Sequence, residues 1–119
     1  MYKNMKDCSD FTVEVQHNIA IITVNLSRAT LKEAGEFKNI LDNIIAQGFK
    51  KIIVDLHEVD FIDSTFLGAL VVNLKKLKGA GGKLLLINLN YSVSVVVELT
   101  RLNKTFEIFQ SKEEALNNI

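Results

Sequence analysis

Hydrophobic and polar positions divide the chain into short strands and longer helices. Residues 11–16 alternate strictly between apolar and polar side chains, which predicts a half-buried strand. Residues 19–24 form a more continuous apolar run, and His17-Asn18 between the two runs is a two-residue turn. This pattern predicts an N-terminal β-hairpin.

Two helices are predicted after the hairpin, because apolar residues recur there at helical spacing. Thr30 and Glu33 match a capping box, and Gly48 provides the stop for the helix between them. Residues 52–56 form a nearly continuous apolar run typical of a buried parallel strand. From Leu67 the spacing becomes helical again, and the run 79–82 ends this second helix. The apolar stripe of that helix is formed by Leu67, Leu70, Val71, Leu74 and Leu77.

The C-terminal third predicts two more strands and two more helices. Residues 83–89 are a buried strand and residues 106–109 a short one. Residues 92–102 fit either a strand or a helix, and the established alternation of strands and helices favours a helix. Ser111 begins a second capping box, which predicts a short C-terminal helix with Ala115, Leu116 and Ile119 on its apolar side.

The predicted order is therefore β-β-α-β-α-β-α-β-α. This order indicates an α/β fold with a mixed, mostly parallel sheet of about five strands and about four helices. A chain of 119 residues has room for one domain, which we place at residues 11–119 after a flexible N-terminal segment at residues 1–10.

Composition narrows the possible functions. Fourteen basic residues balance fourteen acidic ones, so bulk charge argues against direct nucleic-acid binding and against a polybasic membrane anchor. The single cysteine, Cys8, excludes an intrachain disulfide and suits a reducing compartment. No apolar run is long enough for membrane insertion, and residues 1–8 lack the apolar core of a signal peptide. We expect a cytoplasmic protein.

The usual catalytic constellations are missing from the sequence. His17 and His57 are the two histidines, and both are expected to be solvated surface residues without metal-binding partners. The glycine-rich run 79–83 closes a helix and opens a strand, which is the reverse of a phosphate-binding loop. We therefore predict that the protein is not an enzyme and uses no cofactor.

The informative stretch is the polar loop before the second helix. Asp60, Asp63, Ser64 and Thr65 gather at the helix entrance. Asp63 or Ser64 could cap the helix. Alternatively, a hydroxyl at this position could be phosphorylated, because a helix N-terminus accommodates an anion. These residue types at a helix entrance fit both roles. On physical grounds alone, the capping role is favoured.

At this point the sequence resembles the STAS domain family, in particular bacterial anti-sigma factor antagonists. The family signature Asp-Ser-Ser/Thr-Gly-Leu-Gly is similar to residues 63–68, with Phe66 in place of the first Gly. Further similarity is found over residues 52–56, 59–62, 74–78, 81–84 and 99–108. The resemblance implies a helix at residues 92–102. It also implies that a partner anti-sigma factor, an ATP-binding serine kinase, phosphorylates Ser64 and that a serine phosphatase resets the switch.

Two departures from the family pattern fall near Ser64. Thr30 stands where the family usually has an acid, and its capping box favours a helix cap. Phe66 lies off the apolar stripe, so we expect it to be exposed, either as a partner contact or packed on a neighbouring loop. Gly68, by contrast, is expected to pack close to the sheet.

The leading hypothesis is an anti-sigma factor antagonist with Ser64 as the phosphorylation site. Its expected partner-binding residues are Thr30, Asp60, Asp63, Thr65 and Phe66. The runner-up is a stand-alone STAS subunit that docks on a membrane transporter ATPase without phosphorylation. An enzyme with Ser64 as nucleophile ranks third, since no base lies within predictable reach. We expect a monomer or weak dimer with no direct nucleic-acid binding.

Overall fold

The computed structural model describes residues 9–119. Cys8 and most of the expected flexible segment 1–10 lie outside the described residues. The elements in chain order are β1 (Phe11–Gln16), β2 (Ile19–Val24), β3 (Arg28–Ala29), α1 (Leu31–Ala46), β4 (Lys51–Asp55), β5 (Phe61–Ile62), α2 (Ser64–Gly79), β6 (Lys83–Ile87), α3 (Tyr91–Leu99), the 3₁₀ turn η1 (Leu102–Lys104), β7 (Glu107–Phe109) and α4 (Lys112–Asn118).

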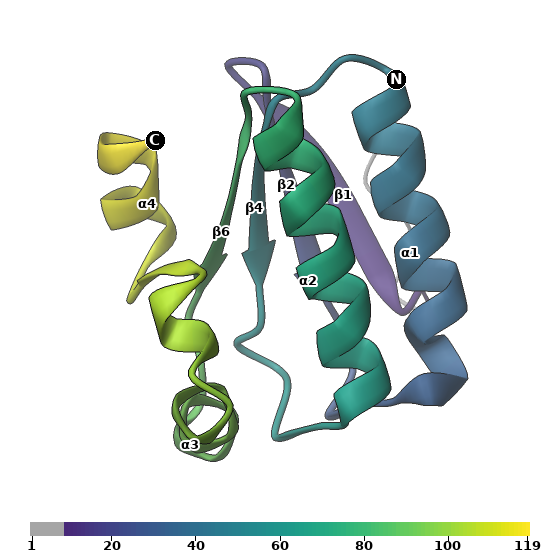
Figure 1. Cartoon of the computed structure of the whole chain (residues 1–119), viewed down its shortest axis with the longest axis vertical. Helices are drawn as coiled ribbons and strands as arrows, with labels where there is room; N and C mark the ends of the chain where they lie inside the picture. The colour runs from purple at the N-terminus through teal and green to yellow at the C-terminus, as the bar shows by residue number, and fades with distance from the viewer. Residues whose placement is uncertain (1–8) are drawn as a thin grey trace.

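The main sheet confirms the predicted class of fold. Its strand order is β1-β2-β4-β6-β7, with β1 antiparallel to β2 and all later neighbours parallel (Figure 1). A second, two-stranded sheet joins β3 to β5. The sequence did not predict this small sheet, because strands of two residues are too short to show a periodicity.

The turn at the N-terminal hairpin forms as predicted. His17 and Asn18 adopt φ values of 52° and 65°, so both central residues are left-handed. This conformation is that of the turn whose twist matches two paired strands. It brings Gln16 opposite Ile19 and fixes the register of β1 on β2.

Helices cover the two faces of the sheet unequally. The larger core joins one face to α1, α2 and α3 through buried residues such as Leu41, Leu70 and Val97. The smaller core places α4 on the other face, where Ala115 packs with Ile53 and Leu85. Figure 1 shows α1 and α2 side by side in front of the sheet, with α4 at its far edge. The ambiguous segment 92–102 is thus largely a helix, as the family resemblance implied.

The turns between elements use glycine where the backbone requires it. Gly48 follows α1 with φ +97°, and Gly81 follows α2 with φ +83°. A Cβ on Gly82 would clash with the carbonyl oxygen of Lys50, so the start of β6 lies close to the backbone before β4. The glycine-rich run is therefore a helix stop and turn, as predicted.

Candidate functional site

The polar loop connects β4 to α2 at the carboxyl end of the parallel strands. In Figure 1 this end is at the bottom, where α1 and α2 both begin. The loop first pairs with β3: the N–H groups of Asp60 and Phe61 donate to the carbonyl of Ser27 at 2.8 and 3.1 Å. The N–H of Asp63 then donates to the carbonyl of Ala29 at 3.1 Å. These bonds fix Asp63 beside the start of α1.

Asp63 caps two helices with one carboxylate. Its Oδ1 accepts a hydrogen bond from the backbone N–H of Phe66 at 2.9 Å, which is the N-cap bond of α2. Its Oδ2 accepts from the backbone N–H of Leu31 at 2.8 Å, at the start of α1. Both helix N-termini carry partial positive charge, so one carboxylate stabilises both. Of the two cap candidates, Asp63 is the cap and Ser64 is not.

Ser64 and Thr65 are the first two residues of α2, and both are exposed. Within residues 9–119, neither hydroxyl forms a hydrogen bond. Asp63 already performs the capping role, so the Ser64 hydroxyl has no structural task in the described part of the chain. It remains accessible for chemistry or for a partner.

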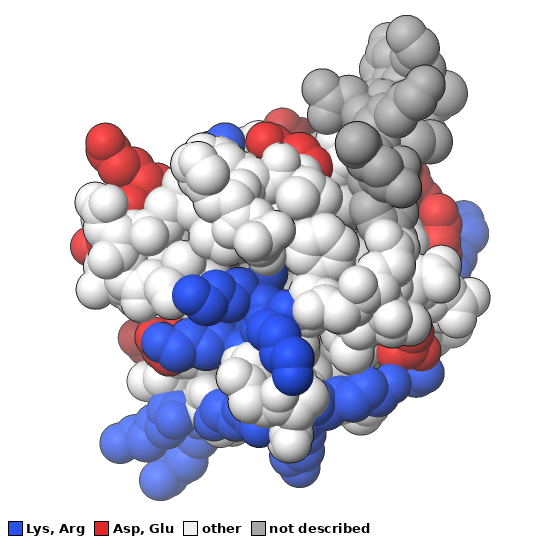
Figure 2. All heavy atoms as spheres, turned by 90° about the horizontal axis from the view of Figure 1, so that it is seen from above, with Lys and Arg blue, Asp and Glu red and all other residues white. Residues whose placement is uncertain are grey.

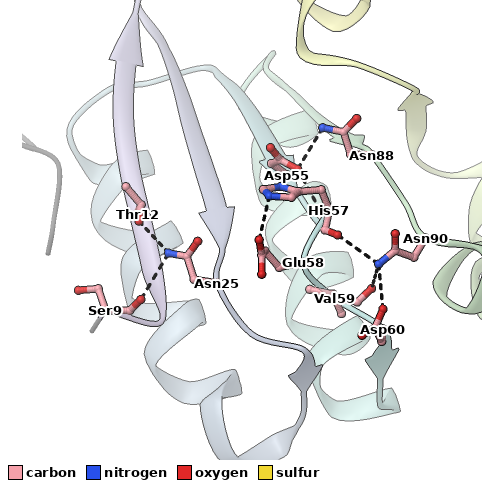
Figure 3. Close-up of polar contacts among 10 residues, drawn as sticks. All are labelled: Ser9, Thr12, Asn25, Asp55, His57, Glu58, Val59, Asp60, Asn88 and Asn90. Carbon is pink, nitrogen blue, oxygen red and sulfur yellow. Dashed lines mark hydrogen bonds and ion pairs between the residues drawn. The ribbon is translucent and has the colours of Figure 1, made fainter. Parts of the chain in front are cut away.

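Asn90, at the start of α3, also binds the loop that precedes α2 (Figure 3). Its Nδ2 lies 2.8 Å from the carbonyl of Val59, 3.2 Å from that of His57 and 3.1 Å from Oδ1 of Asp60. Asn90 stands at the N-cap of α3, yet its side chain makes no cap bond to its own helix. The amide therefore ties the loop before Ser64 to the start of α3.

A second polar cluster stiffens the end of β4. Oδ1 of Asp55 accepts from the backbone N–H of His57 at 3.0 Å and from Nδ2 of Asn88 at 3.2 Å. The ring of His57 lies between Asp55 and Glu58, 3.0 Å from the first carboxylate and 3.2 Å from the second. Figure 3 shows that this cluster and Asn90 lie at neighbouring strand ends. His57 is half-exposed, which agrees with its predicted place on the surface.

The structure corrects the prediction for Phe66. This side chain is fully buried, and its ring stacks on Phe37 of α1 at 4.5 Å and faces Phe11 of β1 at 6.4 Å between centroids. The helix α2 packs against both the sheet and the neighbouring α1, so it buries a second row of residues beside the predicted stripe. Phe66 is therefore a core residue and cannot contact a partner from this position.

Gly68 requires a second correction. The residue is exposed, and a Cβ placed on it would meet nothing within 4 Å. It stands one helical turn after Ser64 and therefore on the same side of α2. The expectation that Gly68 packs close to the sheet is wrong.

Thr30 forms the capping box predicted from sequence. Its hydroxyl oxygen accepts from the N–H of Lys32 at 3.3 Å, while Oε1 of Glu33 accepts from the Thr30 N–H and hydroxyl, each at 3.1 Å. The side chain of Thr30 is therefore engaged within α1. Its predicted role in partner binding stays a prediction.

Three exposed hydrophobic residues surround the loop and were not singled out by sequence analysis. Leu31 is 69% exposed, Phe61 42% and Tyr91 83%. The guanidinium of Arg28 lies over the Phe61 ring at 4.3 Å from its centroid, which keeps that ring at the surface. No sequence pattern marks Phe61 as exposed, because its strand β5 has two residues and is too short to show an alternation.

Among residues 9–119, no three His, Cys, Asp or Glu side chains are grouped so that they could hold a metal ion. No helix in this described part of the chain is both long and apolar enough to span a membrane.

Comparison with known proteins identifies the family. The family model of the STAS domain matches residues 10–115, and the chain belongs to this family. A Thermotoga maritima protein named as an anti-sigma factor antagonist is 29% identical over 110 residues, which cover 92% of this chain and 96% of that protein. The crystal structure of a T. maritima protein that is also named as an anti-sigma factor antagonist superposes with a TM-score of 0.86 at 29% identity, covering 92% of this chain and 93% of that one.

A more distant structure shares the fold. The phosphorylated form of the Bacillus cell fate determinant SpoIIAA has a TM-score of 0.71 at 20% sequence identity. The match covers 91% of this chain and 97% of SpoIIAA. At this identity the likeness establishes the common fold.

Proposed function

We propose that this protein is an anti-sigma factor antagonist controlled by phosphorylation of Ser64. The observation that carries the proposal is the division of roles between Asp63 and Ser64. Asp63 caps both α1 and α2, whereas the neighbouring Ser64 is exposed and has no hydrogen bond within residues 9–119. A modifiable hydroxyl thus stands on a rigid support that does not depend on it. The relatives named as antagonists support the same function.

A phosphate on Ser64 is compatible with the fold. It would add about −1.5 to −2 charges at the first residue of α2. The helix N-terminus stabilises an anion by about 0.3–1 kcal/mol, while the nearby carboxylates of Asp60 and Asp63 oppose it. Because these effects are small and the site is exposed, the folded state survives the modification.

Binding of a partner would be far more sensitive to this phosphate than the stability of the fold is. We define the switch surface as the exposed residues Leu31, Asp60, Phe61, Ser64, Thr65 and Tyr91. Aromatic residues are enriched at protein interfaces, and Phe61 and Tyr91 provide apolar contact area around the hydroxyl. An uncompensated charge buried in such an interface costs on the order of 2–5 kcal/mol. Phosphorylation therefore releases the partner without unfolding the protein.

The partner in this scheme is an anti-sigma factor that is itself an ATP-binding serine kinase, and a serine phosphatase restores the free hydroxyl. The protein acts as a binding module rather than as an enzyme. A structure of SpoIIAA, which shares this fold, represents the phosphorylated form of that protein, and it supports the proposal of a modification-dependent role here.

The test uses a kinase-type anti-sigma factor from the same genome. The purified protein is incubated with that kinase and ATP, and the phosphorylated residue is mapped by mass spectrometry. We expect a single phosphate on Ser64, its loss in Ser64→Ala, and its retention in the matched control Thr65→Ala. Phosphate on Thr65, no phosphate at all, or selective binding to a transporter ATPase would contradict the proposal.

A further inference from the structure

The end of the molecule opposite the switch surface is strongly basic. We call this region the lysine end and define it by Lys50, Lys51, Lys78, Lys83 and Lys104. All five side chains are exposed. Figure 2 views the molecule from this end and shows lysine side chains gathered across it, with few acidic side chains among them.

Parallel strand pairing brings these lysines together. Lys51 begins β4 and Lys83 begins β6, and the two are register partners on neighbouring strands. The backbone N–H of Lys83 also donates to the carbonyl of Lys50 at 2.8 Å. Residues that are 32 positions apart in sequence therefore place like charges side by side, which is destabilising in a sheet.

A small hollow concentrates this charge. It has a volume of about 230 Å³, and Lys78, Lys83 and Lys104 reach it from α2, β6 and η1. Glu107 is the one carboxylate among its lining residues. Within residues 9–119 none of these three lysines forms an ion pair, whereas Lys38 and Lys76 both pair with Asp42. Three lysines thus share the hollow with one carboxylate, so it keeps an excess of positive charge.

We propose that the lysine end docks on a membrane surface rich in anionic lipid. Such a surface removes the repulsion between Lys51 and Lys83 and supplies phosphate groups to the hollow between Lys78, Lys83 and Lys104. The contact is peripheral and inserts no helix. The zero net charge of the chain argues against an anchor that works by bulk charge, but it is a total over the whole chain and allows a local basic surface.

The chemistry of the lysine end favours lipid over other anionic partners. Protein interfaces have an apolar centre and are depleted in lysine. Nucleic-acid sites use arginine for phosphate recognition and exposed aromatic rings for bases. The lysine end contains no arginine, and the exposed aromatic residues of the described chain, Phe61 and Tyr91, lie at the other end. Flexible lysines over an anionic bilayer need no matching shape.

Docking in this way leaves the switch surface free. The parallel strands begin at the lysine end and finish beside the loop that carries Ser64, so the two surfaces face opposite directions (Figure 1). The protein can contact a membrane and a protein partner at the same time. The inference does not depend on phosphorylation of Ser64.

Vesicle flotation tests the inference with the whole chain. We expect binding to vesicles of phosphatidylglycerol mixed with phosphatidylcholine, no binding to phosphatidylcholine alone, and loss of binding as salt is raised. Each lysine near the surface contributes about 5-fold in affinity, so Lys78→Ala/Lys83→Ala should bind about 25-fold more weakly. The control Lys32→Ala/Lys38→Ala has the same net charge and should keep the wild-type affinity.

Four outcomes would overturn the inference. These are absence of binding to the anionic vesicles, equal loss of binding in the two double variants, tighter binding to duplex DNA or RNA than to vesicles, and head-to-tail self-association that depends on Lys78 and Lys83. Thermal unfolding of both double variants verifies that a loss of binding does not come from unfolding.

Discussion

The two ends of the sheet are built by different means. At the switch end, side chains hold the backbone: Asp63 joins α1 to α2, Asn90 joins the loop to α3, and Asp55 joins β4 to Asn88. At the lysine end, backbone turns at Gly48 and Gly81 make most of the connections. One lysine, Lys50, donates from its Nζ to the carbonyl of Ala80 at 2.6 Å, and the other lysine side chains form no hydrogen bond or ion pair within residues 9–119.

This difference indicates where substitutions act on stability and where they act on binding. At the switch end, the side chains of Asp55, Asp63 and Asn90 support the backbone, whereas the hydroxyls of Ser64 and Thr65 form no hydrogen bond within residues 9–119. At the lysine end, the charged side chains contribute little to folding and even repel one another. Mutations at the two ends should therefore have opposite signatures in thermal unfolding.

Phe66→Ala should have the largest effect, because Phe66 connects the switch end to the core. Removing a fully buried aromatic ring leaves a cavity and should lower the free energy of unfolding by about 3–5 kcal/mol. Urea unfolding measures this loss. Phe61→Ala is the matched control, and its exposed ring should cost less than about 1 kcal/mol. Equal losses in the two variants would show that Phe66 is not a core residue.

Asp63→Ala should have the next largest effect. The substitution removes the acceptor of two helix N-termini, and each such bond contributes about 0.5–2 kcal/mol. We expect a combined loss of about 2–3 kcal/mol in chemical unfolding. Asp60→Ala keeps both caps and should lose less than about 1 kcal/mol. If Asp63→Ala were as stable as wild type, the shared cap would have no energetic role.

Lys83→Ala should change stability in the opposite direction. Removing one of two like charges on neighbouring strands should raise the free energy of unfolding by about 0.2–1 kcal/mol at low salt. Screening by salt should remove the gain, since the effect is electrostatic. Unfolding at two ionic strengths tests this. A stabilisation that persists at high salt would indicate another cause.

The ion pairs of Asp42 give an effect of the same small size as that of Lys83, but with a dependence on pH. A hydrogen bond from Lys76, and a second from Lys38, hold the pKa of Asp42 below its ordinary value. Because the folded pKa is the lower one, the stabilisation is present at neutral pH and is lost as pH falls below about 4. Asp42→Asn should cost about 0.2–1 kcal/mol at pH 7, with the difference from wild type vanishing in acid. A difference that grows in acid would have the wrong sign.

The sequence predicted the fold better than the site. Capping signals and apolar spacing located each long helix, and the strand–helix alternation indicated the parallel sheet. The pairing of β3 with β5 could not be predicted from the sequence, because a strand of two residues shows no periodic pattern. The expectation that Phe66 is exposed is wrong because α2 is buried on two sides, against the sheet and against α1. A single apolar stripe therefore understates the buried surface of this helix.

Features that depend on tertiary contacts were beyond the sequence pattern. The hydrogen bond from Leu31 to Asp63 joins residues that are 32 positions apart, and no local sequence motif predicts it. The lysine end did leave a signal: lysines stand at or before the start of β4, β6 and β7. Parallel strands begin at the same edge of a sheet, so this pattern predicts a basic edge even in a chain of zero net charge.

The central claim is that Ser64 controls partner binding without supporting the fold. The most direct measurement is the affinity of wild type, Ser64→Ala and Ser64→Asp for the kinase-type anti-sigma factor, taken together with their thermal midpoints. We expect Ser64→Asp to bind at least about 30-fold more weakly, Ser64→Ala to bind within about 3-fold of wild type, and all three midpoints to agree closely. Equal affinity of Ser64→Asp and wild type would contradict the account.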